Sequence, residues 1–122
     1  MDSETLLLRQ IHPNFVQDGR PTSQAFRPTP KDENQLSVYN GALIAASASW
    51  RHYTDALGFV SAGVMALTHS ECAGEQLKVI EDGDPFPSHC SIDFSGLKKS
   101  EVEKKSKKLA AFAKRHGWLF QP

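Results

Sequence analysis

Two polar stretches, far apart in the chain, carry the residues whose types could do chemistry. The first, RQIHPNFVQDGRPTSQAF (9–26), combines a guanidinium, an imidazole and hydroxyl groups with two prolines and a glycine. Such groups bind a phosphate or a nucleotide ribose, and His12 is a candidate for proton transfer. The candidate ligand-binding residues are Arg9, Arg20, Thr22, Ser23, Phe26 and, further along, Ser37. The alternative is an ordinary polar connection in which Arg9 pairs with an acid and His12 caps a turn.

The second stretch is DPFPSHCSIDF (84–94), in which two prolines predict a rigid turn before a strand. Along that strand His89, Ser91 and Asp93 share one face, whereas Cys90, Ile92 and Phe94 share the other. The second face is expected to be the core face. His89 and Asp93 are therefore candidate catalytic residues for proton transfer. Any half-buried strand alternates in the same way, so a plain solvent face is the alternative.

The two thiols and the five histidines do not form a site of their own. Cys90 is expected to be a small buried hydrophobe, and the acidic neighbours of Cys72 would raise its pKa rather than activate it. The histidines form neither an i, i+4 pair nor an HExxH motif, and no glycine-rich phosphate loop is present. We therefore expect no metal and no cofactor.

A basic segment near the end of the chain is the third candidate. Eight of the 14 basic residues fall within its last 25 positions. The face that could meet nucleic-acid phosphates, with Trp118 and Phe120 stacking on bases, consists of Lys104, Lys107, Lys108, Lys114 and Arg115. A solvated helix face is the alternative.

The helices and strands that must position these residues are predicted from the spacing of apolar residues and from capping and turn residues. Two S/T-x-x-E capping boxes, Thr68 with Glu71 and Ser100 with Glu103, mark the starts of helices. Residues 12–35 are expected to be a long irregular connection that hides a short element at TSQAF. The expected strands are 5–11, 36–39, 59–67, 77–80 and 89–94, and the expected helices are 42–57, 69–76 and 101–116. This order predicts an α+β domain with a mostly antiparallel sheet and helices on one face.

The composition narrows the class of protein. A chain of 122 residues with 39% hydrophobic and 23% charged residues fits one globular domain, residues 1–122. Its net charge of zero favours no polyanionic partner. The acidic start of the chain is not a signal peptide, and no segment approaches the roughly 20 apolar residues of a membrane span. We expect a soluble, cytoplasmic protein with no membrane partner.

The sequence resembles a family of small bacterial proteins. The segments that carry the resemblance are LLRQIHPNFVQDGRPTSQAFRP, LSV, DPFPSHCSIDF and the closing Lys/Ala helix. The resemblance covers most of the chain, implies a bacterial, intracellular protein, and implies no particular activity. A second similarity is to ADP-ribosyltransferase-like domains, which place a basic or imidazole group, then hydroxyls with an aromatic, then a carboxylate on successive strands. The matching positions would be Arg9 or His12, Ser23 with Phe26, and Asp93, although the chain has no clear late glutamate motif.

Three functions remain open on these grounds. The first is a non-catalytic protein that binds a protein partner or a small nucleotide-like ligand through the 9–26 loop and the 88–93 strand. The second is a nucleotide-directed enzyme, for ADP-ribosyl transfer or phosphate-ester chemistry, with Arg9 on phosphate, His12 or His89 moving the proton, and Ser23 on the ribose. The third is nucleic-acid binding through the basic helix. Convergence of Arg9, His12, Ser23 and His89 on one cleft would favour the enzyme or the ligand-binding protein.

Overall fold

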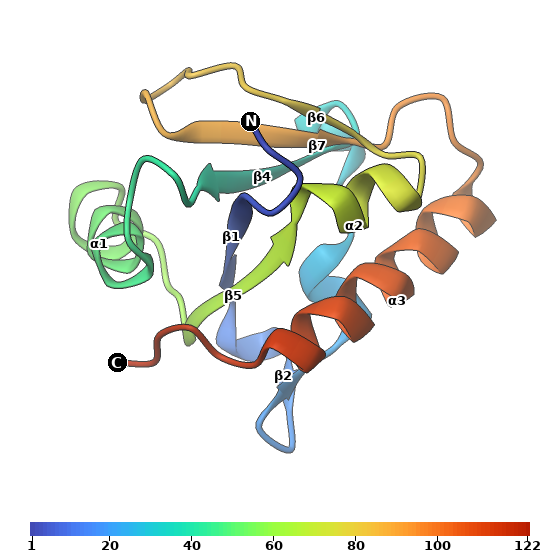
Figure 1. Ribbon diagram of the computed structural model, residues 1–122. Helices are drawn as coiled ribbons and strands as arrows, with labels where there is room; N and C mark the ends of the chain where they lie inside the picture. The colour runs from blue at the N-terminus through green and yellow to red at the C-terminus, as the bar shows by residue number, and fades with distance from the viewer.

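A five-stranded sheet in the order β5-β1-β4-β7-β6 forms the centre of the computed structural model, which describes residues 1–122 (Figure 1). Every neighbouring pair of strands is antiparallel. The strands are β1 (Leu6–Ile11), β4 (Gln35–Asn40), β5 (Gly63–Thr68), β6 (Lys78–Ile80) and β7 (His89–Asp93). The predicted α+β class with an antiparallel sheet is confirmed.

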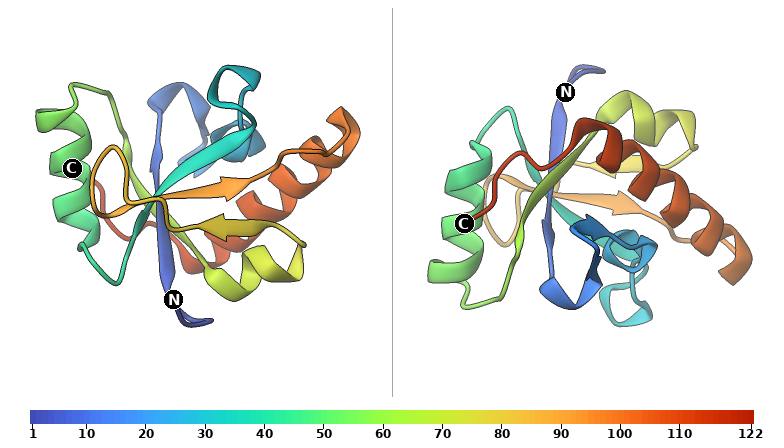
Figure 2. Two further views of the ribbon diagram at one scale, coloured as in Figure 1. Left: turned by 90° about the horizontal axis from the view of Figure 1, so that it is seen from above. Right: turned by 90° about the horizontal axis from the view of Figure 1, so that it is seen from below.

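Helices cover both faces of the sheet, so the expectation of helices on one face is wrong. α2 (His69–Gly74) and α3 (Lys99–His116) lie on one side, and α1 (Ala46–Arg51), which continues as the π-helical turn η4 (His52–Ala56), lies on the other (Figure 2). The reason is visible in β1, where Leu7 and Leu8 point to opposite faces and are 0% and 2% exposed. A strand that is apolar on both faces needs cover on both.

The connection between β1 and β4 is a chain of short elements rather than one irregular loop. The predicted element at TSQAF is confirmed as the 3-10 helix η2. Asp18 and Gly19 both have positive φ and turn the chain between two short strands, as an Asp-Gly pair favours. The elements are η1 (Pro13–Phe15), β2 (Val16–Gln17), β3 (Arg20–Pro21), η2 (Ser23–Phe26) and η3 (Pro30–Asp32).

Two predicted boundaries are wrong, the first because of a local turn and the second because of a contact with a distant strand. The helix expected at 42–57 begins at Ala46, because Asn40 first forms a turn in which its side-chain oxygen accepts the Ala42 N–H at 2.9 Å. The strand expected at 59–67 begins at Gly63, because the chain first bonds to β1 at Ala62, whose N–H donates to the Ile11 carbonyl at 2.7 Å.

The two predicted capping boxes have different outcomes. Thr68 and Glu71 form theirs, with the Glu71 N–H 3.1 Å from Thr68 Oγ1 and the Thr68 N–H 2.8 Å from Glu71 Oε1. The Ser100–Glu103 box is wrong, since α3 begins at Lys99 and Glu101 accepts the Lys98 N–H instead. The two possible N-cap residues, Lys98 and Ser100, are two positions apart, and the helix begins after the earlier one.

The C-terminal segment returns to the sheet. The Val64 N–H donates to the Phe120 carbonyl at 2.8 Å, and the side chain of Trp118 packs against the main core. This approach requires glycine at position 63, where a Cβ would stand 2.5 Å from the Phe120 oxygen. None of the helices combines the length and the apolar character needed to cross a membrane.

Candidate functional site

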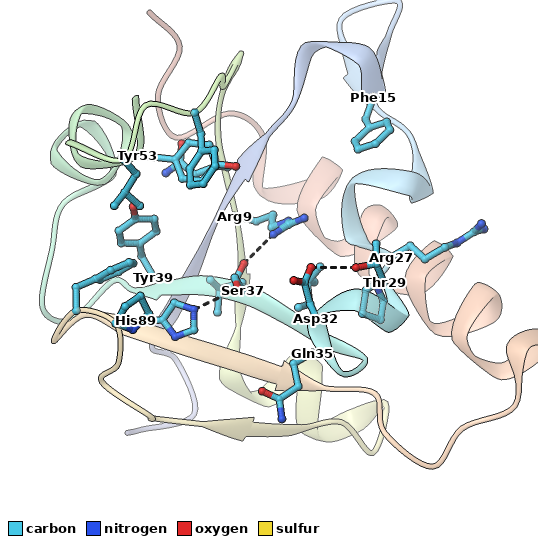
Figure 3. Close-up of a pocket in the computed structure, with 18 of the residues that line it drawn as sticks. Arg9, Phe15, Arg27, Thr29, Asp32, Gln35, Ser37, Tyr39, Tyr53 and His89 are labelled. Atoms are coloured by element: carbon cyan, nitrogen blue, oxygen red, sulfur yellow. Dashed lines mark hydrogen bonds between the residues drawn. The ribbon is translucent and has the colours of Figure 1, made fainter. Parts of the chain in front are cut away.

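The main cavity opens where two neighbouring strands part. β1 pairs with β4 only at Leu7–Asn40 and Leu8–Tyr39, although it pairs with β5 along its whole length. The separation leaves a cavity of about 460 Å³ (Figure 3). It lies between residues 9–10 of β1, residues 35–39 of β4, Phe15, and residues from segments 24–32, 53–59 and 85–89. We call it the β1–β4 cavity. Its volume lies within the range of small-molecule sites.

Arg9 spans the opening between the two strands. Its Nε donates to the Ala25 carbonyl and its Nη1 to the Ser37 carbonyl, both at 2.8 Å. No carboxylate lies within ion-pair distance of it. Burial lowers the pKa of Arg9, although Tyr53 and Asp32 oppose that shift. Arg9 is thus a partly buried cation that uses two of the five N–H donors of a guanidinium.

A serine, a histidine and an aspartate form a hydrogen-bonded line, in which Ser37 and His89 line the cavity and Asp82 lies behind His89. Ser37 Oγ lies 3.1 Å from His89 Nε2, and His89 Nδ1 lies 2.6 Å from Asp82 Oδ1. The second carboxylate oxygen of Asp82 accepts the Ser91 hydroxyl at 2.9 Å. Burial by itself would raise the pKa of Asp82, but the hydrogen bonds from His89 and Ser91 outweigh it and hold that pKa below its usual value. The carboxylate is therefore ionised at neutral pH.

The register of three adjacent strands produces this line. Tyr39 of β4 is paired with His89, and Ser37 is paired with Ser91, so Ser37 and His89 share a face of the sheet. On the other side β6 pairs Ile80 with Ser91. If this antiparallel register is continued by two residues beyond Ile80, Asp82 lies opposite His89 and on the same face of the sheet.

Aromatic side chains enclose the histidine and line the cavity. The Phe86 ring stacks on Tyr39, with centroids 5.0 Å apart, and meets the edge of His89 at 5.3 Å. The Tyr39 hydroxyl lies 2.8 Å from His52 Nδ1, and burial followed by Tyr53 raises the pKa of Tyr39 to about 12, so that hydroxyl keeps its proton at neutral pH. The rings of Tyr53 and Phe59, whose centroids are 5.1 Å apart, line the cavity on the Arg9 side.

No family model, curated protein or solved structure matches this chain. The two resemblances seen in the sequence therefore stay predictions. The positions that an ADP-ribosyltransferase-like site would use do not meet: Arg9 lines the β1–β4 cavity, Phe26 is fully buried in the core, and Asp93 lies at the far end of β7. What the cavity does has to be inferred from its own residues.

Three of the residues singled out in the sequence come together in the cavity. Arg9, Ser37 and His89 all line it, and hydrogen bonds link Ser37 to both of the others. His12 and Ser23 do not converge with them, because neither lines this cavity. His12 caps η1 by accepting the Asn14 N–H at 3.0 Å, and Ser23 opens η2.

The remaining candidates lie elsewhere. Arg20 and Thr22 line a shallow depression together with Lys114. Asp93 shares the His89 face but is four residues along the strand, about 13 Å away, and it accepts the Ser95 N–H at 2.9 Å. The residue that sequence reasoning missed is Asp82, in the segment EDGDP, which reads locally as an acidic turn.

The basic face of α3 is exposed, but its aromatic neighbours are occupied. The exposed residues on it are Lys104, Lys107, Lys108, Lys114 and Arg115. Trp118 Nε1 donates to the Gly19 carbonyl at 3.0 Å, and the Phe120 ring packs on Trp50 at 5.5 Å. Because both rings are held against the protein, they are not placed to stack on bases.

Neither thiol is arranged as a nucleophile. Burial and then Glu71 raise the pKa of Cys72 to about 12, and burial followed by Glu81 and Asp82 raises that of Cys90 to about 11. Both side chains lie in the main core. No group of three or more His, Cys, Asp or Glu side chains is arranged to hold a metal ion.

Proposed function

We propose that the protein binds a small ligand with an anionic group and an apolar or aromatic body in the β1–β4 cavity. This is the ligand-binding function expected from the sequence, placed in the cavity rather than on the whole 9–26 loop. The observation that carries the proposal is Arg9, a cation inside the cavity without a carboxylate partner. The group it would recognise is a carboxylate or a phosphate.

The charges around Arg9 support an anionic ligand. A partly dehydrated guanidinium is costly unless an anion compensates it, and its two carbonyl bonds bring no negative charge. Asp32 is the one carboxylate that lines the cavity, and it accepts the Thr29 hydroxyl at 3.0 Å. Arg27 also lines the cavity, but its guanidinium extends away from Arg9 (Figure 3). The donors left on Arg9 are therefore free for a ligand.

The walls support an apolar or aromatic body. Phe15, Tyr53, Phe59 and Phe86 all line the cavity. Phe59 is 56% exposed, although it is a large apolar side chain. A ligand with a flat ring would cover such a surface and gain the burial of apolar area.

Pairs of probes that differ only in the anionic group test this proposal. We expect benzoate to bind more tightly than benzamide, and AMP more tightly than adenosine, as measured by titration calorimetry and by the rise in Tm that ligand binding produces. The Arg9→Gln variant should lose this preference. Loss of a charge-assisted bidentate contact corresponds to roughly a tenfold or greater loss of affinity.

Arg20→Gln is the matched control, because Arg20 is an exposed arginine outside the cavity. It should bind every probe as the unmodified protein does. Equal binding of the charged and neutral members of each pair, or an unchanged preference in Arg9→Gln, would contradict the proposal.

A further inference from the structure

We propose that Ser37, His89 and Asp82 are a catalytic triad that hydrolyses a carboxylic ester held in the β1–β4 cavity. Ser37 is the nucleophile, His89 the general base and acid, and Asp82 the group that orients the imidazole. The choice of substrate rests on the proposed function, since Arg9 would hold an anionic group of the ester. The hydrolytic step itself does not depend on that anionic group.

The distances have the lengths that the chemistry requires. A nucleophile and its base must lie within about 2.6–3.2 Å, with the base oriented by a third group. The two contacts here are 3.1 Å for Ser37 Oγ to His89 Nε2 and 2.6 Å for His89 Nδ1 to Asp82 Oδ1. As in a Ser-His-Asp site, the serine contacts Nε2 of the imidazole and the aspartate contacts Nδ1.

The direction of each hydrogen bond follows from Asp82. An ionised carboxylate can only accept, so His89 Nδ1 carries the proton and donates it to Asp82 Oδ1. In the neutral ring Nε2 is then the acceptor for the Ser37 hydroxyl. This is the tautomer that a general base needs.

The surroundings give each member a fitting degree of exposure. Ser37 is exposed and lines the cavity, so a substrate carbonyl can reach its hydroxyl. The His89 side chain is 12% exposed, and Phe86 packs against its ring. Ser91 is buried and fixes the second oxygen of Asp82. Hydrogen bonds that served only to hold the Asp82 segment against β7 would need His89 and Ser91 but not the Ser37 hydroxyl on the cavity side of the His89 ring.

The reaction balances with water as the second substrate. Ser37 Oγ bonds to the ester carbonyl carbon while its proton moves to His89 Nε2. That proton then passes to the alcohol oxygen as the bond between this oxygen and the carbonyl carbon breaks. Water attacks the acyl-serine, gives one proton to His89, and the carboxylic acid leaves as Ser37 regains a proton. The net change is ester and water to acid and alcohol.

A covalent probe tests the nucleophile in the unmodified protein. A fluorophosphonate should form one phosphorus–oxygen bond to Ser37 with loss of fluoride, giving one adduct in the intact mass that maps to the peptide containing Ser37. Ser37→Ala should not be labelled, whereas Ser23→Ala, a serine outside the cavity, should be labelled normally. The absence of an adduct on the unmodified protein, or an adduct at another serine, would overturn the triad.

Two esters separate the triad from the anion site. We expect hydrolysis of neutral p-nitrophenyl acetate and, with a lower KM, of the anionic mono-p-nitrophenyl succinate. Ser37→Ala should lower kcat/KM for both by on the order of 1000-fold, and Arg9→Gln should raise the KM of the anionic ester to that of the neutral ester. Hydrolysis without a preference for the anionic ester would support the triad and overturn the anion site. Binding of benzoate or AMP without any hydrolysis or adduct would support the anion site and overturn the triad.

Discussion

Two histidine–carboxylate pairs in this molecule differ in what lies beyond the imidazole. His89 and Asp82 are 2.6 Å apart, and His116 and Glu71 are 2.9 Å apart. The other nitrogen of His89 meets the Ser37 hydroxyl at the cavity wall. His116 instead uses one nitrogen for both oxygens of Glu71 and joins the end of α3 to α2.

The two carboxylates have different second partners as well. Asp82 accepts the hydroxyl of Ser91, whereas Glu71 accepts the backbone N–H of Thr68 in the capping box. Asp82 is therefore held by residues around the cavity, whereas Glu71 caps the start of α2. A histidine–carboxylate pair joins two helices in one place and, in the proposed triad, would support chemistry in the other, and the third partner makes the difference.

The largest expected difference is in activity. Asp82→Asn leaves a neutral side chain that neither fixes the His89 tautomer nor stabilises the imidazolium, so kcat/KM for p-nitrophenyl acetate should fall by on the order of 1000-fold or more. Glu71→Gln makes the same chemical change in the other pair and should leave kcat/KM unchanged. Similar rates for Asp82→Asn and the unmodified protein would remove the distinction between the two pairs.

The next largest difference is in stability. Thr68→Ala removes the hydroxyl that accepts the Glu71 N–H and should lower the free energy of unfolding by about 1 kcal/mol, measured by urea denaturation, with normal hydrolysis. Ser37→Ala removes an exposed hydroxyl and should change that free energy by less than about 0.5 kcal/mol, without hydrolysis. A large loss of stability in Ser37→Ala would assign the Ser37–His89 contact to the fold.

The fold was largely predictable because its signals are local. The alternation of apolar residues in β7 identifies its core face correctly, and the Thr68–Glu71 box marks the start of α2. Two of the failures occur where a distant contact decides the outcome. β5 begins late because of its first bond to Ile11, and α1 covers the second face because β1 is apolar on both sides.

The candidate site was predictable only in part, for the same reason. Arg9, Ser37 and His89 carry chemistry-bearing side chains that any reader of the sequence would note. Their meeting depends on the point at which β1 leaves β4 and on the register of β4 with β7, neither of which a local pattern encodes. Asp82 could have been found from a pairing of β6 with β7 extended by two residues, which places it level with His89.

The smallest difference is in the response to acid, where the two pairs should behave alike. Burial by itself would raise the pKa of Glu71, but hydrogen bonds from Thr68 and His116 lower it, and the pKa of Asp82 is likewise held below its usual value. A carboxyl whose pKa is lower in the folded state stabilises the protein above its unfolded pKa of about 4, and that stabilisation is lost as the pH falls through the folded pKa. Unfolding free energies between pH 7 and pH 3 should therefore fall less steeply in Asp82→Asn and in Glu71→Gln than in the unmodified protein. A parallel curve for either variant would show that its carboxylate is not stabilised by its partners, and for Asp82 it would contradict the stabilising role of the hydrogen bonds from His89 and Ser91.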